Sequence, residues 1–270
     1  MGVRLSAAGG TTAEVVSAPA LSGASPDVLR TPPCPLWGKI ALMSLSIVSV
    51  NVATPAVLLH WPSGDVVSAI DKQPVDAPTL ALSRLNLEGD EQADQRPTPS
   101  GEPVHGGVHQ AVYAYPSEHY PRLTELMGRP LPWGFMGENL TLSGAIEDDV
   151  CIGDTWSWGS ALLQVSAPRG PCYKLGIRMG KQALRTAIRV EALVGWYLRV
   201  LEPGVVPTTG AIEVEARHAA AVTVGQVHRA LQDRANVYPD LADLDVLSPK
   251  LRLGLRVRDR DLSGGVPERD

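Results

Sequence analysis

Glycine and proline interrupt this chain at short intervals, and that spacing limits the elements it can form. The sequence holds 26 Gly and 23 Pro among 270 residues, and the apolar segments between them are short. Frequent turn residues favour a strand-rich fold over a helical bundle. With 44% hydrophobic residues, the chain can still bury one large core. We therefore expect a mainly β or α+β fold.

The clearest local pattern is the alternation of apolar and small polar residues in Ser44–Val52 (SLSIVSVNV), which predicts a half-buried strand. Gly159-Ser160 is a typical hairpin turn between two apolar segments. The same reasoning predicts strands at Val150–Trp158, Ala161–Ala167, Gly195–Leu201 and Ala211–Glu215, helices at Ser117–Met127 and Gly180–Leu193, and a rigid loop at Pro168–Lys174 (PRGPCYK).

The pattern changes near residue 218. Val222–Ala230 and the segments 241–247 and 251–258 have helical spacing, so we expect a small helical appendage over residues 218–270 after a β-rich core over residues 43–217. Residues 1–42 are rich in Ala, Ser, Gly and Pro and lack the order of parts of a secretory signal, which predicts a disordered extension. A further hypothesis is that translation starts at Met43, because the first predicted strand follows it directly.

Charge and cysteine content narrow the class of protein. A net charge of -5 argues against a nucleic-acid polymer or a membrane surface as partner, since both attract a basic surface. The chain has three cysteines, an odd and small number that does not suit a disulfide framework. This count favours a protein of the reducing cytoplasm. The longest apolar candidate, Ile40–Val50, has about half of the ~20 residues that a membrane helix needs, and serines interrupt it.

Cys172 is the cysteine best placed for chemistry. Two prolines stiffen its loop, and Arg169 and Lys174 are close to it in sequence. A neighbouring positive charge lowers the pKa of a thiol, and the resulting thiolate suits thiolate-binding metals. The alternative is a buried cysteine that acts as a small hydrophobe. We prefer that alternative for Cys151, which lies in a predicted strand, and we assign no role to Cys34.

Two glycine-containing loops could contact a ligand. In Val104–His109 (VHGGVH), the glycine pair lets backbone N–H groups approach an anion, although an ordinary tight turn has the same composition. His105 and His109 have the spacing of a helical zinc site, but the intervening glycines disfavour a helix. Glu138 and Asn139 begin a strand, where they could read the edge of a ring such as a pterin or form an Asx-type turn.

Other sequence features favour simpler interpretations. The acidic stretch Leu87–Asp94 (LEGDEQAD) could attract a divalent cation, but it does not match an EF-hand, and we interpret it as a solvated loop. The basic run at 251–260 is interpreted as a solvated helix face. The sequence lacks a G-x-S-x-G elbow, a Walker loop, a G-x-G-x-x-G fingerprint and an H-E-x-x-H helix.

The order of these segments is more specific than any one of them. LEGDEQAD, VHGG, AVYAYPSEHY, GENL, VCIGD, LLQVSAPRGPCYKLG and GWYLRVLEPG follow one another along the chain. This series resembles MOSC domains, in particular the bacterial branch close to the hydroxylaminopurine-resistance reductases. The resemblance extends from about Ser44 to Glu215, and the tail from about Val222 resembles the three-helix segment that often follows in that branch. The stretch RPTPSGEP at residues 96–103 is an insertion relative to that pattern.

The resemblance implies a β-barrel-like core that holds a molybdenum cofactor, with Cys172 as the metal ligand and catalytic residue. It also implies that the cofactor pocket is lined by His105, Gly106, Gly107, Glu138 and Asn139. Arg169 and Lys174 are our candidates for the pterin phosphate, because both donate hydrogen bonds to anions.

Two functions follow as expectations from the resemblance. The first is a cytoplasmic oxidoreductase that reduces small N-hydroxylated compounds, such as hydroxylaminopurines, to amines. A separate flavin-containing protein would supply its electrons, since the sequence shows no flavin, Fe–S or haem motif. The second is a carrier that binds the molybdenum cofactor without catalysis. A third possibility, without a cofactor, leaves Cys172 a merely structural residue.

Overall fold

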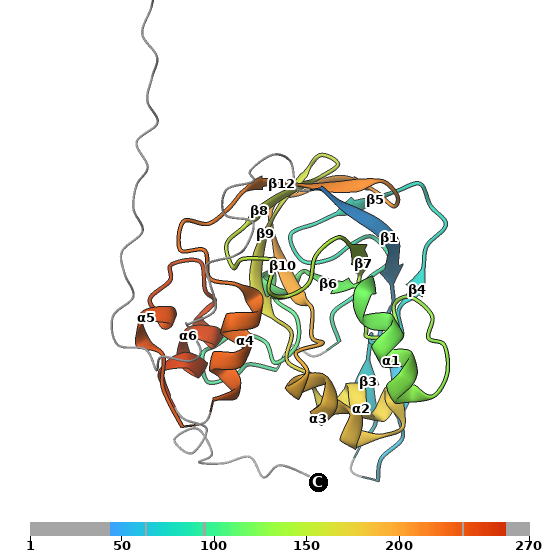
Figure 1. The fold of residues 1–270 in the computed structure, drawn as a ribbon. Coiled ribbons are helices and arrows are strands. Elements are labelled where there is room, and N and C mark those ends of the chain that lie inside the picture. Colours follow the sequence, from blue (N-terminus) through green and yellow to red (C-terminus); the bar gives the residue numbers. More distant parts are fainter. Residues whose placement is uncertain (1–43, 63, 94–95, 234, 258–270) are drawn as a thin grey trace, which may run out of the picture.

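The structure is a computed structural model that describes residues 44–62, 64–93, 96–233 and 235–257 (Figure 1). The predicted disordered extension, residues 1–42, and the proposed start at Met43 lie outside the described residues. In the described part of the chain, no helix reaches the length and hydropathy that a membrane span requires.

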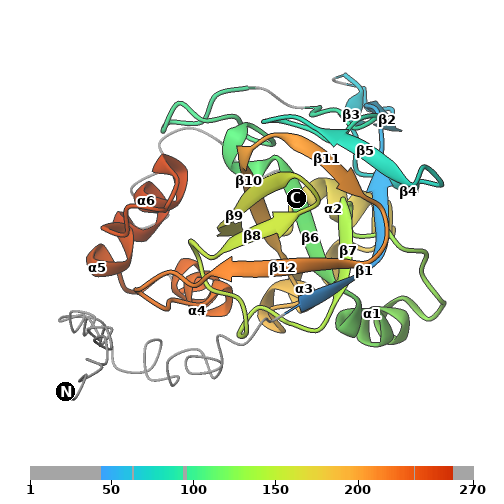
Figure 2. The ribbon, with the colours of Figure 1, turned by 90° about the horizontal axis from the view of Figure 1, so that it is seen from above.

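Seven strands form a closed barrel, which Figure 2 shows from above. Their order around the ring is β12, β8, β9, β10, β6, β7 and β1, and β1 pairs again with β12, where Leu45 faces Ile212. β6 and β7 run parallel, whereas the other neighbouring pairs of the ring are antiparallel. Their bounds are β1 Ser44–Val52, β6 Val112–Pro116, β7 Leu140–Ser143, β8 Thr155–Trp158, β9 Ala161–Pro168, β10 Trp196–Glu202 and β12 Ala211–Ala216. The mainly β fold with a barrel-like core is therefore confirmed.

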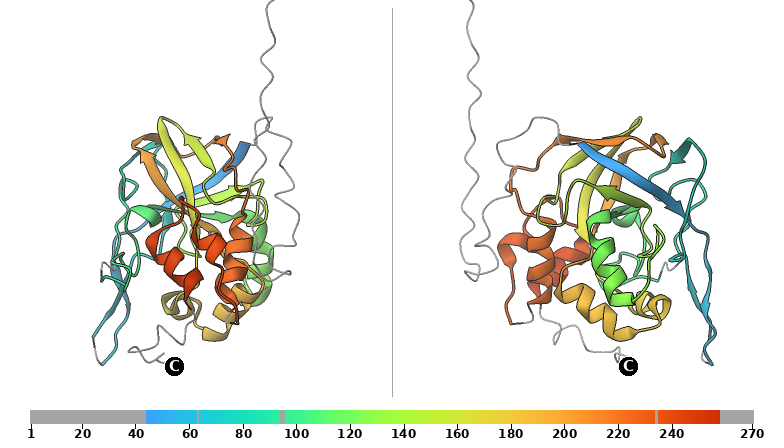
Figure 3. Two further views of the ribbon diagram at one scale, coloured as in Figure 1. Left: turned by 90° about the vertical axis from the view of Figure 1, so that its left-hand side faces the viewer. Right: turned by 45° about the vertical axis from the view of Figure 1, so that its right-hand side comes forward.

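Shorter elements surround the ring. The remaining strands are β2 Ala56–Leu59, β3 Val66–Ser68, β4 Gln73–Pro74, β5 Thr79–Leu82 and β11 Gly204–Pro207, of which β2 pairs with β3, β5 with β11, and β4 with the end of β1. The helices are η1 Val108–Gln110, η2 Ser117–His119, α1 Tyr120–Met127, α2 Tyr173–Met179, α3 Gln182–Val190, α4 Val224–Gln232, α5 Pro239–Ala242 and α6 Pro249–Arg256. Figures 1 and 3 show α4, α5 and α6 grouped on one side of the barrel.

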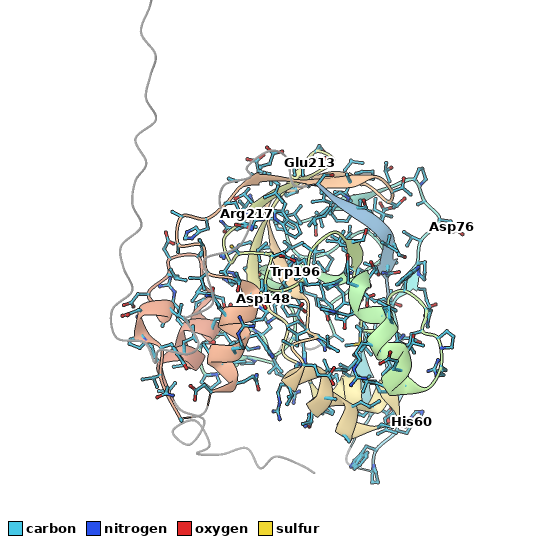
Figure 4. The ribbon with its side chains drawn as sticks, viewed as in Figure 1. His60, Asp76, Asp148, Trp196, Glu213 and Arg217 are labelled. Carbon is cyan, nitrogen blue, oxygen red and sulfur yellow. The ribbon has the colours of Figure 1, made fainter. Side chains whose placement is uncertain are left out.

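Large aromatic side chains fill the barrel. Trp156, Trp158 and Trp196 are fully buried, and the rings of Trp156 and Trp196 meet edge to face with their centroids 6.0 Å apart. Trp196 lies near the middle of the molecule in Figure 4. Val224 and Val227 of α4 belong to the same hydrophobic cluster as the barrel tryptophans. The helices after residue 218 therefore share the core of the barrel.

A second hydrophobic cluster lies outside the first. It joins Tyr113 and Tyr115 of β6 with Leu123 of α1, Leu175 of α2 and Ile188 of α3. The hydroxyl of Tyr113 donates to the Val194 carbonyl at 2.8 Å. This cluster packs α1, α2 and α3 against one end of the barrel, and it supports the segment that carries Cys172.

Two sequence predictions are wrong in their boundaries. The helix predicted at Gly180–Leu193 is two helices, and the first of them, α2, begins at Tyr173, within the predicted rigid loop. Gly180 has a φ of 68°, a left-handed conformation that glycine adopts easily and that ends α2. The strand predicted from Val150 begins only at Thr155, because a turn through Gly153, with a φ of 90°, precedes it. Cys151 is nevertheless buried, as expected.

Candidate functional site

One pocket brings together most of the residues that the sequence singled out. Its empty volume is about 690 Å³, the part open to solvent included. The lining residues are Ser68, Ala69, Ile70, Lys72, Asp90, Glu91, Gln92, Ala93, His105, Gly106, Gln110, Ala111, Tyr113, Gly137, Asn139, Arg169, Cys172, Lys174 and Tyr197. Six of the eight predicted site residues are among them.

Cys172 stands at the junction between barrel and helix. β9 ends at Pro168, and the next backbone N–H, that of Arg169, donates to the Gly195 carbonyl at 3.2 Å. Cys172 itself is the extended residue immediately before α2, and its carbonyl accepts from the N–H of Leu175 at 3.1 Å. The end of a barrel strand and the first turn of a helix thus fix the position of the sulfur.

The surroundings of Cys172 favour its thiolate. Burial alone would raise the pKa of the thiol. A hydrogen bond with the His105 side chain and the positive charge of Arg169 lower the pKa by more than burial raises it, and the resulting pKa is about 6. The N–H of Leu175 acts in the same direction. At neutral pH the side chain is therefore mainly an anionic, soft sulfur ligand.

Arg169 is a buried cation with an unused donor. Its side chain is 5% exposed, and its guanidinium carbon lies 5.3 Å from the centre of the Tyr113 ring. Tyr197 also hydrogen-bonds the guanidinium. Nη1 is nevertheless buried without a hydrogen-bond partner among the described residues. Because a buried, unsatisfied donor is costly, this atom indicates a site for an anionic or acceptor group of a ligand.

Lys174 connects the pocket wall to the β2–β3 hairpin. The residue is 5% exposed, and its Nζ donates to the Val67 carbonyl at 2.9 Å. Arg178, one turn further along α2, pairs with Asp71. These two contacts hold the segment after β3 against α2, which places Ser68, Ala69 and Ile70 in the wall of the pocket.

The HGG turn is held by two glutamines. Gly106 has a φ of 92°, and its N–H donates to Oε1 of Gln110 at 3.1 Å. A side chain at this φ is strained, and a Cβ at Gly106 would lie 2.4 Å from Oε1 of Gln92, so the Gln92 side chain would have to move. The N–H of Gly107 donates to Oε1 of Gln92 at 2.7 Å. Gly107 is not among the described residues that line the pocket. The turn brings His105 to Cys172.

His109 points to different partners from those of His105. Its Nδ1 lies 3.2 Å from Nη1 of Arg199, and its Nε2 lies 3.7 Å from a carboxylate oxygen of Glu102. Within the described residues, no three His, Cys, Asp or Glu side chains are grouped as ligands of one metal ion. The two histidines therefore do not form the helical zinc pair that their spacing could suggest.

The structure corrects the role expected for Glu138. This residue is fully buried and outside the described pocket wall, and its Oε1 accepts from the Tyr120 hydroxyl at 2.5 Å, from the Gly134 N–H at 2.9 Å and from the Thr141 hydroxyl at 2.9 Å. Burial raises the pKa of this carboxyl, against the effect of those donors. Glu138 organises the loop that precedes β7 through Oε1 and is not among the lining residues, while its Oε2 is buried without a hydrogen-bond partner among the described residues.

Asn139 lines the pocket, but protein groups already use its amide. Its Oδ1 accepts from the Tyr113 N–H at 3.1 Å, and its Nδ2 donates to Oδ2 of Asp90 at 3.0 Å and to the Asn51 carbonyl at 3.3 Å. The side chain joins β6, β1 and the Asp90 loop. It thus supports the pocket wall, rather than presenting the free donor and acceptor edge that was expected.

Sequence reasoning missed Lys72 and Asp90, which line the pocket as a buried ion pair. Asp90 belongs to the acidic stretch that was expected to be a solvated loop. That expectation is wrong for this residue, which is 8% exposed. The apolar Leu87, three residues before Asp90, was the available sign that the stretch turns inward, and the structure buries it fully. Nothing in the pattern around Lys72 marked it.

Comparison with known proteins gives one family. A model of the MOSC domain matches residues 101–217. The uncharacterized protein YflK of Bacillus subtilis is 36% identical over 184 residues, which are 68% of this chain and 79% of that protein. A protein of Gibberella moniliformis named reductase is 36% identical over 177 residues, but these are only 30% of that protein. The crystal structure of YiiM from Geobacillus stearothermophilus matches 78% of this chain and 97% of its own at a TM-score of 0.62 and 33% identity.

These similarities coincide with the site. The matched range 101–217 includes six of the seven barrel strands and the pocket residues from His105 to Tyr197. The relatives and the solved structure extend the similarity over most of the described chain. The chain belongs to the MOSC domain family.

Proposed function

We propose that this protein is a molybdenum-cofactor-dependent oxidoreductase that reduces N-hydroxylated compounds to amines. The observation that carries the proposal is the pairing, in one pocket, of a thiol with a pKa of about 6 and a buried guanidinium with an unused donor. MOSC membership and a relative named reductase support an oxidoreductase, the class to which this reaction belongs.

The residues present fit such a cofactor. The Cys172 thiolate is a soft sulfur ligand, the kind that a thiolate-bound metal needs. Nη1 of Arg169 is an orphaned donor for a phosphate oxygen, and Lys174 adds a second positive charge to the same wall. The Gln110 side chain lines the pocket and accepts from the Gly106 N–H through Oε1, so its amide NH₂ can offer a neutral hydrogen bond to a pterin ring.

Each side chain has a defined task under this proposal. Cys172 binds the metal, and His105 keeps the sulfur anionic and oriented through its hydrogen bond. Arg169 and Lys174 neutralise the phosphate. The bound cofactor supplies two-electron redox chemistry. The electrons come from a separate flavin-containing protein in the cytoplasm, and the reaction removes N-hydroxylated compounds, which is a detoxifying role.

Metal and pterin content test the cofactor assignment. The full chain is expressed in a host that makes molybdenum cofactor, beside Cys172→Ser and the matched control Cys151→Ser, whose cysteine is buried away from the pocket. We expect near-stoichiometric molybdenum in the parent and the control, and little in Cys172→Ser. Equal molybdenum in all three proteins would remove Cys172 from its role.

Turnover separates the enzyme from the cofactor carrier. Loaded protein is mixed with 6-hydroxylaminopurine and chemically reduced methyl viologen, which replaces the natural electron donor. We expect adenine to form at a rate that depends on Cys172. Stoichiometric molybdenum without any adenine would favour the carrier.

A further inference from the structure

Lys72 is a buried cation in a part of the pocket wall that the proposed cofactor contacts do not use. It lies in the loop between β3 and β4, is 7% exposed, and lines the same pocket as Cys172. Its ammonium pairs with the carboxylate of Asp90. Cys172, Arg169 and Lys174 come from the β9–α2 segment, whereas Lys72 and Asp90 come from the two loops that follow β3 and β5.

Asp90 holds the ammonium in place. Oδ1 of Asp90 accepts from Lys72 and, at 2.9 Å, from the Ala53 N–H, while Oδ2 accepts from Nδ2 of Asn139 at 3.0 Å. Two donors besides Lys72 thus fix the carboxylate to the residue just before β7 and to the chain just after β1. A fixed carboxylate pins the ammonium that pairs with it, so the position of Nζ is set before any ligand arrives.

The ammonium keeps hydrogen-bonding capacity for a ligand. Nζ carries three N–H donors, and Asp90 is its hydrogen-bond acceptor in the described part of the chain. Burial lowers the pKa of Lys72, whereas the charge of Asp90 opposes that effect. Because Lys72 lines the pocket and Asp90 takes one of its three donors, the other two can serve an acceptor in the pocket.

The charge of the pair indicates which acceptor fits. Lys72 and Asp90 are together neutral, so a phosphate approaching Nζ would also meet the Asp90 carboxylate. A neutral hydroxyl oxygen accepts a hydrogen bond from an ammonium without that repulsion. Arg169 has no carboxylate partner among the described residues, so it is the better phosphate site of the two.

We propose that Lys72 binds the hydroxyl oxygen of the N-hydroxylated substrate and distinguishes the substrate from its amine product. This inference rests on the proposed function and adds its substrate-binding residue. The amine lacks the oxygen, and its binding leaves the Nζ donors without that acceptor. Product therefore binds more weakly than substrate, which favours its release.

Equilibrium binding without electrons tests the proposal. Cofactor-loaded protein is dialysed against 6-hydroxylaminopurine or adenine in the absence of any reductant, so that no turnover occurs. The proteins are the parent, Lys72→Met, the neutral double variant Lys72→Met/Asp90→Asn, and the exposed control Lys181→Met. The double variant removes the unpaired buried carboxylate that could destabilise the single variant. Molybdenum content and melting temperature are measured for each.

We expect the parent and the control to bind 6-hydroxylaminopurine about tenfold or more tightly than adenine, the ratio typical of one charge-assisted hydrogen bond. Both Lys72 variants should bind the two ligands about equally and retain their molybdenum. A preference that survives in the folded double variant overturns the proposal. Loss of molybdenum from the folded Lys72 variants also overturns it, because Lys72 would then hold the cofactor. If the unsubstituted protein itself holds no molybdenum, the proposed function is overturned, and the inference on Lys72 falls with it.

Discussion

The side chain of His105 hydrogen-bonds the sulfur of Cys172, although one residue precedes β6 and the other stands at the start of α2. The contact depends on the HGG turn, which Gln92 and Gln110 hold. An imidazole from one segment thereby sets the protonation state of a thiol in another.

Alkylation of the cofactor-free protein should show this effect. With a pKa of about 6, half of the Cys172 side chains are thiolate at pH 6, fewer below and more above. Iodoacetamide should therefore modify Cys172 at a rate that rises with pH to a midpoint near 6. His105→Ala removes the hydrogen bond that lowers the pKa, so the midpoint should move upward and the rate at pH 7 should fall about tenfold. Peptide mass spectrometry measures both, with buried Cys151 as the internal control, and an unchanged midpoint would contradict the assignment.

Replacing Arg169 by methionine should affect ligand binding and stability in opposite directions. The side chain is buried with an unsatisfied Nη1, so its removal relieves a desolvation cost in the cofactor-free protein. We expect an equal or higher melting temperature for the cofactor-free variant, together with at least tenfold weaker retention of the cofactor. Calorimetry and molybdenum analysis after dialysis test the two parts. A large loss of stability would show that the contact with Tyr113 outweighs the buried charge.

Glu138 should matter for stability and not for ligand contact. Oε1 accepts three hydrogen bonds in the interior, and Glu138→Ala leaves all three donors unsatisfied. We expect a loss of about 3 kcal/mol in the free energy of unfolding. Glu125→Ala, at an exposed position of α1, is the control and should change little. Chemical denaturation gives both values, and molybdenum per folded chain should stay equal in the two variants.

Two glycines allow a matched test of the HGG turn. Gly106 and Gly101 have φ values of 92° and 83°, so alanine strains the backbone at both. A Cβ at Gly106 would meet the Gln92 side chain, whereas one at Gly101 has nothing within 4 Å. Gly106→Ala should therefore destabilise by about 1–3 kcal/mol and slow the alkylation of Cys172, while Gly101→Ala should show strain alone and normal alkylation. Equal alkylation rates of Cys172 in both variants would show that the HGG turn does not control the reactivity of this thiol.

The sequence patterns predicted the barrel better than its site. Alternation predicted β1 with its observed bounds, because one face of that strand is buried in the core. The motif order pointed to Cys172 and His105, and charge type pointed to Arg169; all three line one pocket. Glu138 lies outside the pocket lining, which the sequence could not show, because a carboxylate at a strand start has the same pattern whether it contacts a ligand or Tyr120 and Thr141. Lys72 was missed because its partner Asp90 is distant in sequence, and only the fold brings the two together.

The barrel closes between its first strand, β1, and its last, β12. During synthesis, all pocket residues from Ser68 to Tyr197 are therefore made before β12, and the ring can close only after them. Pairings between sequence-distant strands form slowly, so the nascent chain passes through a stage with β1 lacking its β12 neighbour. Premature termination before Ala211 would leave that edge of β1 exposed for good, and such fragments should aggregate instead of forming a smaller working protein.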